Sequence, residues 1–265
     1  MGLSINQNIA ALNSYRNLSN TQNDLSKSLE KLSSGFRINR AADDAAGLAI
    51  SEGLRAQVGG LKVAARNAQD GISVAQTAEG ALTEVHAMLQ RMNDLAVQYN
   101  NGTQNTDSQA ALQAEFDELE TEIGRIQTNT KFNGVTLFAG NALTFQTGYE
   151  NADSIDVSAT ALADFSAAAG MAAIDITDSD TLQAAITEVS AQRAELGAIQ
   201  NRFEHTIKNI NVATENLSAS ESRIRDTDMA AEMVNFTRAQ ILSQAGTAML
   251  AQANQIPQSV LKLLG

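Results

Sequence analysis

The sequence of 265 residues contains no cysteine, no tryptophan, a single proline and only 4% aromatic residues. The lack of cysteine excludes disulfide scaffolds, zinc fingers, iron–sulfur clusters and cysteine nucleophiles. All-β folds normally need frequent glycine and proline at their turns, so one proline together with abundant Ala, Leu, Gln, Asn and Glu favours long helices. We therefore expect a mainly α-helical protein.

The sequence also lacks the features of a membrane or nucleic-acid-binding protein. No apolar run approaches the roughly 18 residues of a membrane span, and residues 1–12 show no basic segment followed by an apolar one. We expect no membrane span, and either a cytoplasmic protein or export by a route that reads no cleaved signal. The net charge of −12 argues against a nucleic-acid partner, because binding phosphates needs a basic field.

No catalytic or cofactor-binding pattern is present. The two histidines, His86 and His205, lie outside any HxxxH or HExxH pair, and the phosphate-binding and nucleophile-elbow glycine motifs are absent. The acidic pairs at 43–44 and 226–228 stand at expected helix starts, where carboxylates usually act as caps. We expect no enzyme activity, no cofactor and no metal.

Apolar spacing predicts a series of long helices. Residues 3–32 form one amphipathic pattern, and a second pattern runs from about 44 to 100, which corresponds to about 85 Å at 1.5 Å per residue. A third helix follows the turn at 100–105, and a final helix follows the break at 225–228. Together these patterns predict a long helical rod of antiparallel, coiled-coil-like helices.

The clearest periodic signal lies between residues 182 and 224. Apolar residues recur there at intervals of seven: Leu182, Val189, Leu196, Phe203, Ile210, Leu217 and Ile224. Such a heptad series predicts a coiled-coil seam. Ahead of it, Asn133-Gly134 between apolar residues predicts a two-residue hairpin, and residues 143–147 alternate like a strand, so we expect a small β element at about 131–157.

The terminal helices differ from the rest because no other element is available to cover them. We expect residues 1–40 and 226–265 to pair, and residues 41–225 to form the rod domain. Two paired helices leave apolar edges exposed, so the remaining surface must be buried by other copies of the chain. The predicted packing residues are Ile5, Ile9, Leu25, Leu29, Met233, Ile241 and Met249.

Both ends of the chain resemble bacterial flagellin. The run SSGFRINRAADDAAGLAI at 33–50, preceded by SINQN at 4–8, resembles the N-terminal flagellin signature. SRIRDTDMA at 222–230 and NQIPQSVL at 254–261 resemble the C-terminal signature, and NTKFNG at 129–134 resembles the hairpin between them.

This resemblance implies a self-assembling structural subunit of the flagellar filament, in a short form without large outer domains. It also implies unfolded export by the flagellar secretion system, a chaperone on the C-terminal helix, cap and hook-associated partners, and an extracellular location. The alternative is a hook–filament junction protein, which shares the N-terminal pattern but usually not the C-terminal one. A secreted enzyme on a helical rod would lack a nucleophile, base or metal set.

The resemblance further implies recognition by the Toll-like receptor for flagellin through Gln90, Arg91, Leu95, Gln98 and Glu115. The spacing predicts that Leu95 lies off the packing stripe. Residues 91 and 115 are equidistant from position 103 in the turn, so an antiparallel helix pair would bring Arg91 beside Glu115.

The apolar C-terminal end resembles the flagellin segment that a cytosolic innate immune receptor reads. The residues concerned are Val260, Leu261, Leu263 and Leu264. The alternative is that these four residues only pack in the filament core.

Overall fold

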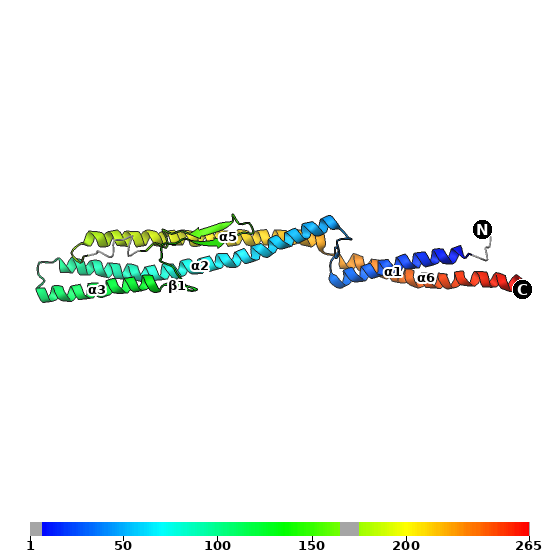
Figure 1. Cartoon of the computed structure of the whole chain (residues 1–265), viewed down its shortest axis with the longest axis horizontal. Helices are drawn as coiled ribbons and strands as arrows, with labels where there is room; N and C mark the ends of the chain where they lie inside the picture. Colours follow the sequence, from blue (N-terminus) through cyan, green and yellow to red (C-terminus); the bar gives the residue numbers. More distant parts are fainter. Residues whose placement is uncertain (1–6, 165–174, 265) are drawn as a thin grey trace. The chain divides into compact units, whose positions relative to one another are not determined.

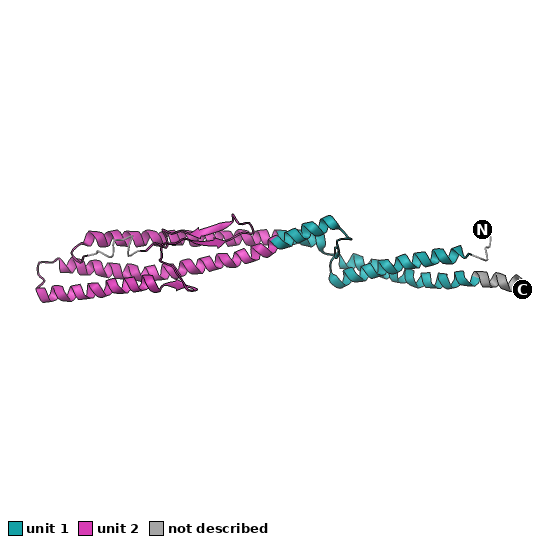
Figure 2. Cartoon of the chain, viewed as in Figure 1, with its two compact units in different colours: residues 1–56, 217–265 teal, residues 57–216 magenta. Residues whose placement is uncertain are grey.

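The computed structural model describes residues 7–164 and 175–264, and side chains as far as residue 255. The chain forms two compact units: a central unit of residues 57–216 and a terminal unit of residues 1–56 with 217–265 (Figure 2). The division predicted at residues 40 and 226 falls between helices, whereas these units divide within two long helices. The predicted mainly α fold class is confirmed.

The central unit is built on three helices: α2 (Ala45–Tyr99), α3 (Thr106–Asn129) and α5 (Ser179–Arg225), which lie side by side in Figure 1. α2 and α5 run antiparallel, because Gln200 donates to Glu79 whereas Asn100 donates to the carbonyl of Thr177 ahead of α5. The three helices predicted for this part of the chain are confirmed close to their expected bounds.

The heptad residues of α5 form the core of the central unit. Leu182, Val189, Leu196 and Phe203 are fully buried and Ile210 nearly so. They belong to one core cluster with apolar residues of the other two helices, including Leu82, Val85, Leu89, Met92, Phe116 and Ile123. The predicted coiled-coil seam is therefore confirmed for this unit.

The ring of Phe203 lies directly against the backbone of α2 at Gly71. A Cβ atom at Gly71 would lie 2.5 Å from Cζ of Phe203, so only glycine leaves room for the ring. On another side, Phe145 meets Phe203 edge to face, with ring centroids 5.7 Å apart. Phe203 thus joins two helices and the small β element.

The β element consists of two antiparallel strand pairs. β1 (Lys131–Phe132) and β2 (Val135–Thr136) are joined by Asn133 and Gly134, whose φ angles of 48° and 83° are those of a type I′ turn. β3 (Leu143–Gln146) pairs with β4 (Ser154–Val157), placing Leu143 opposite Val157. The predicted hairpin and strand are confirmed.

In the terminal unit, α1 (Ile9–Ser34) packs against α6 (Met229–Leu264). The pair is antiparallel, because Asn8 donates to the carbonyl of Ala253 at 2.8 Å while Leu18 lies against Gly246. Carboxylates cap two helices as predicted: Asp44 accepts from the Gly47 N–H, and Asp228 accepts from the N–H groups following it.

Two connectors, residues 35–44 and 226–228, lie beside each other in the terminal unit and are joined by an antiparallel bridge between Phe36 and Asp226. The Arg37 N–H donates to the Arg225 carbonyl at 2.6 Å. The guanidinium of Arg225 lies 4.7 Å from the ring centroid of Phe36 and pairs with Glu52 at 2.7 Å. These contacts hold both connectors to the start of α2, and we call the residues that make them the connector clasp: Phe36, Arg37, Glu52 and Arg225.

Asp43 organises the same connector from within. Its Oδ2 atom accepts from the N–H groups of Arg40 at 2.9 Å and Asn39 at 3.1 Å. These backbone hydrogen bonds stabilise the carboxylate and lower the pKa of Asp43 below its usual value.

We predict that Gly71→Ala lowers the free energy of unfolding by about 1–3 kcal/mol, because the new methyl group forces the buried Phe203 ring from its position. The matched control is Gly80→Ala in the same helix. Nothing lies within 4 Å of a Cβ at that position, so alanine there stabilises by up to about 1 kcal/mol through helix propensity. Thermal unfolding followed by circular dichroism tests both, and equal melting temperatures for the two variants would contradict the packing argument.

We predict that Arg225→Gln destabilises the chain by roughly 1–3 kcal/mol, since it removes a largely desolvated cation–π contact and an ion pair together. Arg223→Gln, two residues earlier and exposed, is the control and is expected to change stability by less than about 0.5 kcal/mol. Chemical denaturation measures both. If Arg225→Gln left the free energy of unfolding unchanged, the connectors would be held together without the guanidinium.

Candidate functional site

Small side chains make up much of the seam between α1 and α6. Buried and half-buried positions of α6 recur every three or four residues and include Ala239, Ser243, Gly246 and Ala253, together with the larger Phe236 and Leu250. The facing positions of α1 include Ala11, Ser14, Leu18, Thr21 and Ser28. The small residues let the two helices approach closely, but they bury little apolar area.

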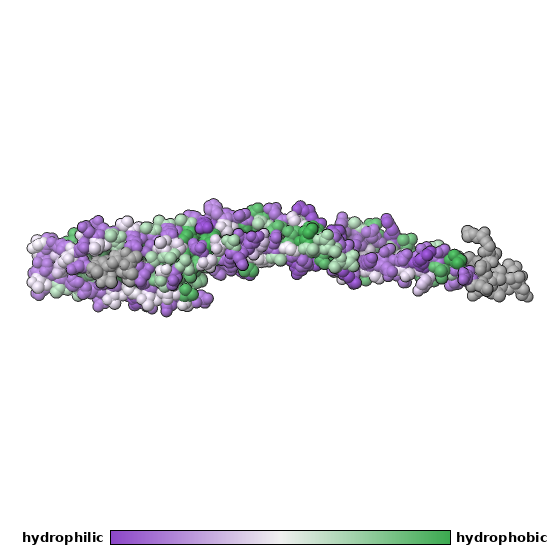
Figure 3. Space-filling view, turned by 45° about the horizontal axis from the view of Figure 1, so that its top comes forward, coloured by the Kyte–Doolittle hydropathy of each residue, from purple (hydrophilic) through white to green (hydrophobic). Residues whose placement is uncertain are grey.

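The large apolar residues of this helix pair mostly lie on the outside. Each of the following is half exposed or more, except Met229 at 47%: Ile9, Leu12, Tyr15 and Leu29 on α1, and Met229, Met233, Val234, Ile241, Leu242 and Met249 on α6. Fully burying one such side chain yields about 1.5–3 kcal/mol. In the single chain most of that stabilisation is unused, and Figure 3 shows hydrophobic side chains on the surface of this unit.

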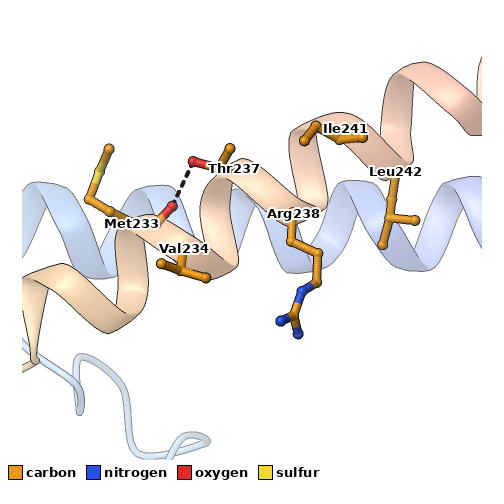
Figure 4. A pocket seen from close by; sticks show the side chains of 6 residues that line it. All are labelled: Met233, Val234, Thr237, Arg238, Ile241 and Leu242. Atoms are coloured by element: carbon orange, nitrogen blue, oxygen red, sulfur yellow. Dashed lines mark hydrogen bonds between the residues drawn. The ribbon is translucent and has the colours of Figure 1, made fainter.

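A shallow groove runs along the outer face of α6. Its walls are Met233, Val234, Thr237, Arg238, Ile241 and Leu242, which project from successive turns in Figure 4. The Thr237 hydroxyl is already used, because it donates to the Met233 carbonyl at 2.8 Å. Apart from the Arg238 head group, the groove therefore offers hydrocarbon surface, which suits another apolar helix better than a polar ligand.

The predicted packing residues occupy three kinds of position. Ile9, Leu29, Met233, Ile241 and Met249 lie on the exposed outer faces. Leu25 is half buried in the α1–α6 seam. Ile5 lies outside the described residues. The exposed positions thus match what an uncovered stripe requires, and Leu25 serves the pairing within the chain.

The four C-terminal residues predicted for the cytosolic receptor lie beyond the described side chains. The backbone of α6 is helical as far as Leu264, and the side chains of Val260, Leu261, Leu263 and Leu264 fall outside the described residues.

A second group of predicted site residues lies where α2 meets α3. The Arg91 guanidinium bonds the Glu115 carboxylate at 2.7–2.8 Å, so the predicted antiparallel pairing is confirmed. Gln90 and Gln98 are exposed on α2. With about half of each charged side chain exposed, this ion pair contributes well under about 1 kcal/mol.

The prediction that Leu95 lies off the packing stripe is wrong. Leu95 is fully buried, together with Leu89, Met92 and Ala96. The reason is that α2 contributes to a core with both α3 and α5, which widens its buried face beyond the stripe that one partner would cover. Leu95 lies beneath the exposed residues around it.

The described residues offer little to catalysis or metal binding. Among them, no group of three or more histidine, cysteine or acidic residues is arranged to hold a metal ion. No helix in the described part of the chain is both long and apolar enough to cross a membrane. Among the described residues, the surface feature that stands out is the exposed apolar face of the terminal unit.

Comparison with known proteins agrees with this picture. A sequence model of the bacterial flagellin N-terminal helical region matches residues 5–142, and one of the bacterial flagellin C-terminal helical region matches residues 179–264. These two matches include every described helix, the β1–β2 hairpin and the connector clasp.

Similar full-length proteins carry related descriptions. A flagellin of Halalkalibacterium halodurans is 54% identical and one of Bacillus subtilis 49% identical, each aligned over 98% of this chain and 99% of its own length. A flagellar filament 33 kDa core protein of Treponema phagedenis is 44% identical over the same shares.

A solved structure is also similar. The crystal structure of Bacillus cereus flagellin superposes with a TM-score of 0.50 at 28% identity, over 55% of this chain and 88% of that one. Family matches at both ends, full-length relatives and a similar solved fold agree, and we conclude that the chain belongs to the bacterial flagellin family and is a structural protein, not an enzyme.

Proposed function

We propose that the chain is the repeating subunit of an extracellular flagellar filament, and that the outer faces of α1 and α6 are buried between copies. The observation that carries this proposal is the row of large apolar side chains left outside the α1–α6 seam. The outer faces of such a helix pair are stabilised only when further helices cover them, and identical subunits supply identical helices.

The central unit has a different role in this proposal. Its seam is already filled by its own three helices, so it needs no partner to remain folded. Repetition of the terminal contact builds the polymer, and the central unit gives each subunit its outer body. The alternative of a hook–filament junction protein gains no support, since the relatives named above are flagellins and a filament core protein.

The first test is polymerisation of Ile241→Asp. We expect this variant to form no filaments while keeping most of its helicity. A charge on the exposed face of the single chain has little free-energy cost, but it costs several kcal/mol once a neighbouring copy desolvates it. Electron microscopy after salt-induced assembly shows whether filaments form, and circular dichroism measures the helicity.

The control for this test is Ile241→Leu, which keeps an apolar side chain of the same size and is expected to assemble like the parent chain. Wild-type filament yield from Ile241→Asp would contradict the proposed burial. Short rings in place of micrometre fibres from the unaltered protein would favour a junction protein.

Export and handling partners belong to the same proposal. An exposed apolar face is an aggregation hazard before assembly, so a chaperone that covers α6 in the cytoplasm fits the uncovered residues of that helix. Unfolded export by the flagellar secretion system, assembly beneath a filament cap and attachment to hook-associated proteins follow from the family resemblance. The apolar C-terminal end is proposed as the segment read by a cytosolic immune receptor.

The monomer is further proposed as a ligand of the Toll-like receptor for flagellin. Support comes from the resemblance of the 90–98 and 113–115 segments to the family's receptor-binding segments, and from the exposure of Gln90, Arg91, Gln98 and Glu115. Leu95 supports this surface from below, since it is buried in the core of the central unit.

We predict that Arg91→Ala and Glu115→Ala each weaken receptor signalling by purified monomer while leaving its melting temperature nearly unchanged, because the ion pair is exposed. Leu95→Ala has a different signature: it lowers stability by about 2–5 kcal/mol through a core cavity. Reporter-cell assays beside thermal melts separate the two effects, and full signalling from an Arg91→Ala, Glu115→Ala double variant would refute this patch.

A further inference from the structure

The chain contains two exposed Asn-Gly pairs in different backbone settings. Asn101-Gly102 lies in the turn between α2 and α3, and Asn133-Gly134 forms the turn of the β1–β2 hairpin. In any Asn-Gly pair, the missing glycine side chain lets the glycine nitrogen approach the asparagine amide carbon. Local sequence therefore makes both pairs equally prone to deamidation, and only their structures distinguish them.

The hairpin restrains Asn133. Its φ of 48° and the 83° of Gly134 are fixed by paired residues on both sides, Phe132 with Val135 and Lys131 with Thr136. Ring closure needs rotation about the Cα–C bond of the asparagine, so that the following nitrogen reaches the side chain. At Asn133 that rotation opens the strand pair.

The turn at Asn101 is restrained far less. Asn101 makes two backbone hydrogen bonds: its N–H donates to the Gln98 carbonyl at 3.2 Å, and its carbonyl accepts from the Gln104 N–H at 3.0 Å. Neither belongs to a strand pair. Within the described part of the chain, the Gly102 N–H donates to no acceptor, so its nitrogen is available.

A neighbouring donor also faces the Asn101 side chain. The Thr103 N–H donates to Asn101 Oδ1 at 3.4 Å. This contact is long and weak. It places a donor near the oxygen that becomes negatively charged during attack, and a donor there stabilises the developing charge.

We propose that Asn101 is a site of spontaneous deamidation, and that the hairpin protects Asn133 from the same reaction. The Gly102 nitrogen attacks Cγ of Asn101, the Cγ–Nδ2 bond breaks, and ammonia leaves with the proton released from the Gly102 nitrogen. Water then opens the resulting succinimide ring at either carbonyl carbon. The products are aspartate and isoaspartate.

The reaction changes the end of α2. Each event adds one negative charge to a chain whose net charge is already −12, and it does so at the C-terminal end of a helix, where the macrodipole disfavours an anion. The isoaspartate product also inserts a methylene group into the backbone of the turn. Next to it, the side chain of Asn100 donates to the Thr177 carbonyl, a contact that depends on the path of this turn.

The test compares the two asparagines within one molecule. The intact folded protein is incubated in mildly alkaline buffer, and peptide mass spectrometry with isoaspartyl-specific methylation measures conversion at each position. We expect Asn101 to convert about tenfold faster than Asn133 or more, because opening the hairpin adds to the barrier at Asn133. Equal rates, or faster conversion at Asn133, would overturn the proposal.

Two controls identify the cause. In denaturant the two pairs should convert at similar rates, and a tenfold difference that persists there would show that sequence, not structure, sets the order. Gly102→Ala should slow conversion at Asn101 without changing Asn133, since the new methyl group hinders the attacking nitrogen. Undiminished conversion in that variant would exclude the Gly102 nitrogen as the nucleophile.

Discussion

A helix can bury only as much of its surface as its neighbours cover, and this limit organises the whole chain. In the central unit α2 shares one core with α3 and α5, so a wide face of it is buried, including Leu95. In the terminal unit α6 has α1 as its helical partner, and that partner covers a narrow stripe. The number of covering helices thus explains both the burial of Leu95 and the exposure of Ile241 and Leu242.

The inner and outer faces of α6 also differ in side-chain size. The inner stripe of α6 contains Ala239, Gly246 and Ala253, which allow close approach, beside the half-buried Phe236 and Leu250, whereas the methionines, Ile241 and Leu242 lie on the outer face. Most globular helices place more of their large apolar residues inward. Residue choice therefore assigns two different tasks to two faces of one helix: recognition of α1 on the inner face and contact with other molecules on the outer face.

Sequence periodicity predicted the elements well where one residue type repeats against one partner. The heptad series from Leu182 to Ile224 and the Asn133-Gly134 turn gave correct elements, because coiled-coil packing and left-handed turns each have a strict local requirement. The Arg91–Glu115 contact was predictable from the symmetry of the turn alone. All three depend on local spacing.

What periodicity could not supply is the number of neighbours. The pattern around Leu95 is the same whether α2 has one partner or more, so its burial was mispredicted. The small-residue seam between α1 and α6 was also missed, because alanine, serine and glycine carry little weight in an apolar pattern. The contact of Arg225 with Phe36 joins residues far apart in the sequence, and no spacing rule predicts it.

The pairing of the two ends has a consequence for the order of events in folding. The hydrogen bond between Asn8 and Ala253 closes a loop of nearly the whole chain, because its partners lie 245 positions apart in the sequence. Contacts of such long range form late, since the entropy of closing the loop is lost before the contact is made. A chain that becomes free from its N-terminal end onward cannot complete the packing of α1 against α6 until its last helix is free. Part of the first helix therefore stays uncovered until the last helix is completely free.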